Sequence, residues 1–504
     1  MTKNLTAGPP VRLILLFTLP LLIGNLFQQA YSFTDAAVVG RLLGVNALAA
    51  VGASGSIQFF LIGFSIGSST GLAIPVARAF GAGDLPAVRR RVAAGLIIIT
   101  GIAVATTLAG TLGARTVLGW MDTPPELVHD STVFLVVLSA GSSAMVAFNF
   151  LSAMIQALGD SRTPLIFLVI SCLINAGLVV LFVGGLGMGV GGAAAATVVA
   201  QGLSVVLCLV LIRRRMPILR LSRADLAVGH EELCESLRLG LTLGFQMSVI
   251  ATGAAILQYG VNNLGSETVA AFTAAMRVDQ MAVAPLASVG VAMTTFVAQN
   301  RGAAQPRRIR VGVFRTGIIT SCFGVLLGAM IYLWGQSVVR VFVGSGAETV
   351  VALAHRYLVI NSALYWVLAL LFLLRNTVQG LGSTSVPTMA GVMELVVRTI
   401  AGLVLVGHIG FLGVCIAAPL AWFLALVPVA LAWFVLRRRL VADELAGGAP
   451  PVLPTAVPAA PPTSVVEPLV PVAPASALPA DESGGDRRDS LAAPRQSEVI
   501  CGGR

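Results

Sequence analysis

The amino-acid sequence predicts an all-α integral membrane protein whose twelve transmembrane helices form two six-helix lobes, followed by a disordered C-terminal tail. Of its 504 residues, 57% are hydrophobic and only 11% are charged, whereas ordinary soluble domains carry roughly 25% charged residues. Apolar runs of about 20 residues, the length that crosses a bilayer, recur along the chain. The 54 glycines favour helices that pack closely through small residues.

Short segments rich in proline, glycine or arginine separate the apolar runs and mark the loops. The first run has no small-residue cleavage site, so it is interpreted as a membrane span and not as a signal peptide. The expected spans are 13–37, 47–79, 92–118, 127–157, 164–186, 190–212, 237–261, 267–299, 310–342, 349–380, 388–408 and 411–436.

Arginines gather in alternate loops, for example at 89–91, 213–215 and 437–439, and the opposite loops hold none. Arg41, just beyond the first span, is the main exception. The positive-inside rule therefore predicts a multi-pass protein of the cell inner (cytoplasmic) membrane with both termini in the cytoplasm.

An internal repeat relates the two halves of the chain. ALAAVGA at 47–53 matches TVAAFTA at 268–274, and QALGDSRTP at 156–164 matches QGLGSTSVP at 379–387, at offsets of 221 and 223 residues. Six spans in each half predict a pseudo-two-fold axis along the membrane normal and a cavity between two lobes, the geometry of alternating access. A duplicated bundle without a transport role is the alternative.

The repeat and the composition together define four regions. The first lobe is expected at 1–212, a cytoplasmic linker at 213–236 and the second lobe at 237–440. From about 441 the chain becomes rich in proline and alanine, so residues 441–504 are predicted to form a disordered cytoplasmic tail.

A polar stripe follows the first span. Asn25, Gln28, Ser32 and Asp35 are spaced to share one helix face, with Tyr31 beside them. An ionisable group inside a membrane is costly and marks an ion or substrate pathway by default. The stripe is therefore predicted to line a water-filled cavity, and a contact between helices is the alternative.

Asp35 is the candidate coupling residue, because a carboxylate that gains and loses a proton on opposite sides of a membrane can couple a proton gradient to transport. It could also hold sodium or a cationic substrate directly. Its expected partners in the same lobe are Asn149, Asn175 and Thr197.

The second half carries its own charged set, for which a structural role and a role in binding or coupling remain open. Glu394 and Arg398 are spaced to pair on one helix face, and Glu394 is the member expected to titrate. The tentative set is Arg277, Asp279, Arg375, Gln379, Glu394 and Arg398.

Catalytic motifs are absent from the sequence: the four histidines are scattered, and no zinc-protease, nucleophile-elbow or Walker motif occurs. We therefore expect no enzyme, no metal site and no cofactor, with H+ or Na+ as the coupling ion. The expected partners are small organic molecules and the lipid bilayer. Nucleic acid is not expected, and the protein is expected to act as a monomer.

The motifs TDAAVVGRLLG, QALGDSRTP, GVGGAAAAT and GLGSTSVP make the chain resemble bacterial members of the multidrug and toxic compound extrusion (MATE) family up to about Leu440. The resemblance implies a V-shaped pair of lobes that exports amphipathic, often cationic compounds in exchange for protons or sodium. It also implies that Asp35 is the coupling carboxylate, supported by Gln28, Tyr31, Asn175 and Thr197. Likeness to a subgroup of bacterial members also implies functional roles for Arg277 and Glu394.

One position departs from the pattern of many family members, which place an aspartate four residues after the fifth-span asparagine. Here Asn175 is followed by Val179, so the first-lobe cation site has a single carboxylate and proton coupling is favoured over sodium. Two other functions remain open: a lipid-linked precursor flippase of the same superfamily, and a membrane-embedded binding or signalling protein.

Overall fold

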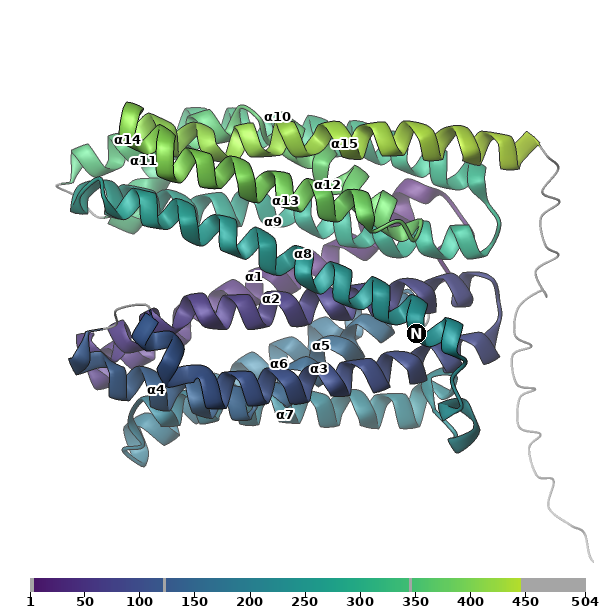
Figure 1. Cartoon of the computed structure of the whole chain (residues 1–504), viewed down its shortest axis with the longest axis horizontal. Coiled ribbons are helices and arrows are strands. Elements are labelled where there is room, and N and C mark those ends of the chain that lie inside the picture. Colours follow the sequence, from purple (N-terminus) through teal and green to yellow (C-terminus); the bar gives the residue numbers. More distant parts are fainter. Residues whose placement is uncertain (1–3, 121–123, 344–346, 446–504) are drawn as a thin grey trace, which may run out of the picture. The chain divides into compact units, whose positions relative to one another are not determined.

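The computed structural model describes residues 4–120, 124–343 and 347–445, and every regular element within these ranges is helical. The helices lie roughly side by side along one direction (Figure 1). The first half contains α1 (Pro10–Leu43), α2 (Val45–Gly81), α3 (Leu85–Trp120), α4 (Pro125–Ala140), α5 (Ser142–Ala157), α6 (Arg162–Val179) and α7 (Gly189–Arg215). The second half contains α8 (His230–Asn262), α9 (Ser266–Gly302), α10 (Pro306–Val343), α11 (Glu348–Ser362), α12 (Tyr365–Gly380), α13 (Ser385–Ile400), α14 (Val406–Ile409) and α15 (Phe411–Leu445).

The prediction of an all-α membrane protein is confirmed. Within the described residues, ten helices are long and apolar enough to cross a membrane, or up to twelve if each of two bent pairs is one span. The bent pairs are α4 with α5, at 46°, and α11 with α12, at 51°. Gly141 stands at the first bend, where an added Cβ would lie 2.1 Å from the Val198 side chain. A larger residue would clash there, so glycine permits this close contact.

Helices extend past two of the expected boundaries. The expected linker at 213–236 is partly helical, because α7 continues to Arg215, short 3-10 turns cover Pro217–Leu219 and Arg223–Leu226, and α8 already begins at His230. The tail was expected from 441, but α15 continues to Leu445. The length of an apolar run predicts the part of a helix that crosses the membrane. It does not predict how far the helix continues into the charged residues on either side. The rest of the predicted tail lies outside the described residues.

The end of α15 is held by an ion pair, since Glu444 accepts a hydrogen bond from Arg310 at the start of α10. We expect a chain that stops after Leu445 to keep wild-type transport and stability. A chain that stops after Leu440 loses the ion pair and should unfold about 1 kcal/mol more easily, because a part-buried pair contributes about that much. Thermal unfolding and transport of the two truncations check this, and inactivity of the longer one would contradict it.

The two halves meet through α1 and α2 of the first and α8 and α9 of the second. Glycines bring the backbones together at this contact. An added Cβ would lie 2.3 Å from the Leu239 carbonyl oxygen at Gly71, and 2.0 Å from the Gln299 carbonyl oxygen at Gly81. Small residues allow such backbone approach in membrane proteins, and here they close the interface between the halves.

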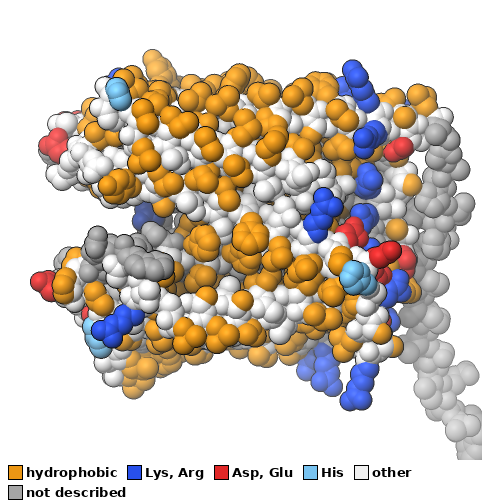
Figure 2. Space-filling model, in the orientation of Figure 1, with side chains coloured by type: hydrophobic (Ala, Val, Ile, Leu, Met, Phe, Trp, Pro, Cys, Tyr) orange, Lys and Arg blue, Asp and Glu red, His pale blue; other side chains and the backbone are white. Residues whose placement is uncertain are grey.

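The contact between the halves is sealed at the end of the molecule that carries the arginine clusters. Glu235 of α8 accepts hydrogen bonds from Arg78 and Arg91 of the first half, and Arg90 donates to Glu232 over 3.0 Å. At the opposite end the surface is hollowed between the two halves (Figure 2). The conformation is therefore closed at the arginine-rich end and open at the other.

Candidate functional site

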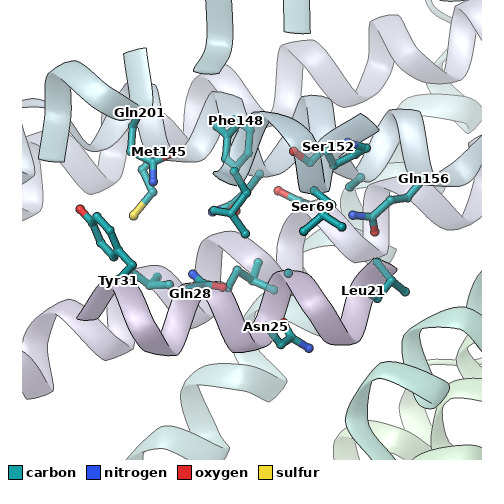
Figure 3. Close-up of a pocket in the computed structure, with 18 of the residues that line it drawn as sticks. Leu21, Asn25, Gln28, Tyr31, Ser69, Met145, Phe148, Ser152, Gln156 and Gln201 are labelled. Carbon is teal, nitrogen blue, oxygen red and sulfur yellow. The ribbon is translucent and has the colours of Figure 1, made fainter. Parts of the chain in front are cut away.

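A cavity of about 290 Å³ lies against the first half, lined by residues of α1, α2, α4, α5, α6 and α7 and by one face of α9. Gln28 and Tyr31 of α1 point across it toward Phe148 of α5 and Gln201 of α7 (Figure 3). The wall thus mixes aromatic and apolar surface with amide and hydroxyl groups. Small-molecule sites are mostly apolar pockets of this kind, in which a few polar groups fix the orientation of the ligand.

Three predicted residues meet in one hydrogen-bonded group, of which Tyr31 and Thr197 line the cavity, whereas Asn175 is buried and does not line it. The Tyr31 hydroxyl donates to Thr197 Oγ1 over 3.0 Å, and Asn175 Nδ2 donates to the same oxygen over 3.3 Å. Thr197 Oγ1 in turn donates to the backbone oxygen of Ala193 over 3.2 Å. This single hydroxyl therefore ties α1, α6 and α7 together.

The other polar residues predicted for the first half occupy separate positions. Ser32 lines the cavity and donates to the backbone oxygen of Gln28 over 3.2 Å. Asn149 lines the opposite wall and donates to Ser65 Oγ over 3.3 Å. Asn25 donates to Ser288 Oγ of α9 over 3.0 Å, so it also links the two halves.

Asp35 lies one helical turn beyond Tyr31 on α1 and is not part of the cavity wall. Its Oδ1 is buried and has no hydrogen-bond partner among the described residues. An unsatisfied buried acceptor costs roughly 1–3 kcal/mol, and more when it is charged. A proton on this carboxylate would remove the charge and so lower the cost of burying the group.

Tyr31→Phe removes the hydroxyl that links α1 to Thr197 and leaves the ring in place. We expect export to fall several-fold, up to about tenfold, because one hydrogen bond contributes about 0.5–1.5 kcal/mol. Efflux rates measured at equal protein amounts check this. Tyr259→Phe is the matched control, because Tyr259 is exposed on α8; an equal loss in both variants would contradict a specific role for Tyr31.

The charged set of the second half is arranged differently from the predicted pairing. Glu394 Oε1 accepts from Arg375 Nη1 over 2.9 Å, and both side chains are nearly inaccessible. The predicted pair of Glu394 with Arg398 is wrong, because Arg375 reaches Glu394 from α12. Arg398 has no hydrogen-bond or ion-pair partner in the part of the chain that the structure describes.

The remaining members of this set make other contacts. Asp279 Oδ1 accepts from the Tyr365 hydroxyl over 2.7 Å, and Gln379 Nε2 donates to Gln246 Oε1 over 2.9 Å. Arg277 is exposed and lines a second cavity. Tyr365 was not predicted, since a single tyrosine within an apolar span carries no signal of its own. Gln201 was not predicted either, although an amide within a membrane span is such a signal.

The family model named MatE matches residues 20–181 and 243–404. The two segments start 223 residues apart, which is the offset of the internal repeat. This agreement supports the duplication of a six-span unit.

Among curated proteins, the probable multidrug resistance protein YpnP of Bacillus subtilis is 27% identical over 381 residues, covering 75% of this chain and 84% of that protein. An FAD transporter of Shewanella oneidensis is 23% identical over 348 residues, which cover 67% of this chain and 76% of that protein.

A solved structure of the outward-facing conformation of a multidrug resistance MATE family transporter superposes with a TM-score of 0.80 at 22% identity, over 88% of this chain and 99% of that one. This likeness establishes the fold. Because the family model matches well over half of the residues, the chain belongs to the MatE family.

Proposed function

We propose that the protein is a secondary active antiporter that exports amphipathic, often cationic organic compounds by alternating access of its two lobes. The observation that carries the proposal is the cavity of about 290 Å³ in the first half, bordered by α9 of the second, in a molecule whose halves meet through glycine contacts and are hollowed apart at one end. The names of the relatives, several of them probable multidrug resistance proteins, support drugs or similar compounds as substrates.

Protons are the proposed coupling ion, and Asp35 is the proposed coupling residue. Val179, at the position where many relatives carry a second aspartate, is fully buried in an apolar cluster with Val39 and Val183. This arrangement leaves one carboxylate for the ion. Proton exchange needs a single carboxylate, whereas a sodium site uses several oxygen ligands.

In the proposed cycle, Tyr31, Thr197 and Asn175 connect Asp35 to the cavity. Ionised Asp35 needs hydrogen-bond donors, whereas protonated Asp35 carries a donor of its own. Gain of a proton therefore changes which hydrogen bonds the end of α1 can make next to the Tyr31–Thr197 contact. A change at this contact alters the cavity wall and so couples proton binding to release of the substrate.

Proteoliposomes with an imposed ion gradient test the proposal. We expect a pH gradient alone to drive uptake of ethidium, and a sodium gradient alone to drive none. Uptake driven by sodium without a pH gradient would overturn proton coupling. No uptake under either gradient, for ethidium and a panel of other cationic dyes, would overturn export of organic cations and favour the flippase alternative.

The proposal also places the protein as a monomer in the inner membrane, with the arginine-rich end and both termini in the cytoplasm. Single cysteines introduced at Asp84, between α2 and α3, and at Glu267, in the first turn of α9, lie at opposite ends of the molecule and report the orientation. An impermeant maleimide added to intact cells should label position 267 only. Labelling of position 84 only would reverse the orientation.

A further inference from the structure

The second half contains two cavities that are separate from the site described above. One has a volume of about 300 Å³ and the other of about 150 Å³. Asp279, Arg398 and Trp422 line both cavities. The combined space lies among α8, α9, α11, α12, α13 and α15, within one lobe.

The charges around these cavities do not balance. Three arginines and two carboxylates line the walls, which leaves one positive charge in excess when all are ionised. The Arg375–Glu394 ion pair compensates itself, and Asp279 accepts a hydrogen bond from Tyr365. Arg277 has an interaction partner of its own, so the arginine of the larger cavity that is open to a ligand is Arg398.

Arg398 makes no hydrogen bond and no ion pair within the described residues, and Asp279 is the carboxylate close enough to act on it electrostatically. The Nε of Arg398 is buried and makes no hydrogen bond in the described part of the chain. A buried donor without an acceptor is costly, above all on a charged group. The planar guanidinium presents several N–H groups in the fork geometry that fits a carboxylate or a phosphate. An anionic ligand would satisfy these donors.

One part of the larger cavity's wall is apolar and aromatic. Phe272 and Tyr357 stack edge to face with ring centroids 5.4 Å apart, beside Met276, Leu257 and Trp422. The wall also holds the uncharged polar side chains of Gln258, Thr273 and Gln280. The volume of about 300 Å³ is at the lower end of the range for small-molecule sites. The space thus suits a small ligand with an apolar body as well as an anionic group.

We propose that this cavity binds small aromatic organic acids, with the carboxylate or phosphate on the Arg398 guanidinium and the ring against Phe272, Tyr357 and Trp422. This site differs from the proposed export site in its lobe and in the charge of its ligand. Binding here requires neither Asp35 nor an ion gradient, so it is tested apart from transport.

The test uses the purified full-length protein in detergent, titrated with benzoate at constant ionic strength and followed by tryptophan fluorescence and by calorimetry. We expect saturable benzoate binding, and binding of inorganic phosphate at least about tenfold weaker because phosphate lacks the ring. Arg398→Gln should weaken benzoate binding at least about tenfold, the effect of losing a charged hydrogen-bond donor. Asp279→Asn should strengthen it several-fold, because it removes a nearby negative charge.

Arg340→Gln is the matched control, since Arg340 lies on α10 outside both cavities and pairs with the exposed Glu348; its benzoate affinity should equal that of the wild type. Absence of saturable benzoate binding, or equal affinity in wild type and Arg398→Gln, would overturn the proposal. Equal affinity for phosphate and benzoate would overturn the role of the aromatic wall. If Arg398→Gln fails to fold, the benzoate titration of Asp279→Asn still tests the proposal. Benzoate affinity equal to or weaker than that of the wild type in this variant would contradict it.

Discussion

Replacing Asp35 with asparagine abolishes proton-driven export, while the protein still reaches the membrane and folds. Asparagine keeps the size of the side chain and cannot exchange a proton, so the coupling step is lost. Asp35 Oδ1 has no hydrogen-bond partner among the described residues, so the substitution breaks no contact that involves this atom. The uptake rate of ethidium in proteoliposomes under a pH gradient should fall to the level of empty vesicles.

Asp443→Asn is the matched control for Asp35, because Asp443 is exposed near the end of α15 and the same chemical change there should leave transport intact. Asp35→Glu keeps an exchangeable proton and should retain part of the activity. Unchanged uptake by Asp35→Asn would remove this carboxylate from the mechanism. Loss of ethidium binding together with transport would instead make Asp35 a direct ligand of the substrate.

The sequence predicted the spans well because hydrophobic length is a local property. Each expected span coincides to within one residue with a helix, a bent helix pair, or, at 164–186 and 388–408, an α-helix continued by a π-helical turn, and most of the helices extend further at their ends. The polar stripe was predicted only in part. A period of 3.6 residues places Asp35 on the face of Gln28 and Ser32, but the period does not say where along α1 the cavity ends.

Local sequence patterns could not predict which residues of different helices contact each other. The spacing of Glu394 and Arg398 allows a pair on one helix, yet Glu394 pairs with Arg375 of α12. Spacing reports which residues are neighbours on one helix, whereas tertiary packing chooses among all the partners within reach. The glycine contacts between the halves were missed for the same reason, since 54 glycines give no indication of which ones face another backbone.

Replacing Gly71 with valine should prevent closure of the arginine-rich end. An added Cβ would lie 2.3 Å from the Leu239 carbonyl oxygen and 2.9 Å from Gly240 Cα. Both are backbone atoms, so no side-chain rotation can make room, and the two further methyl groups of valine increase the clash. Overpacking of a tight contact costs about 1–3 kcal/mol. The conformation described above should therefore lose roughly five- to 150-fold in population, since 1.4 kcal/mol corresponds to a factor of ten.

An antiporter must visit both conformations in each cycle, so destabilising one of them lowers turnover even when every residue of the cavity is intact. Spin labels at positions 84 and 307, at the arginine-rich end of the two halves, should show a longer distance in Gly71→Val, and ethidium uptake should fall about tenfold or more. Gly101→Val is the matched control, because a Cβ at Gly101 of α3 meets no atom within 4 Å. If Gly71→Val keeps both the distance and the uptake of the control, the contact of α2 with α8 is not what closes this end, and the mechanism loses its structural basis.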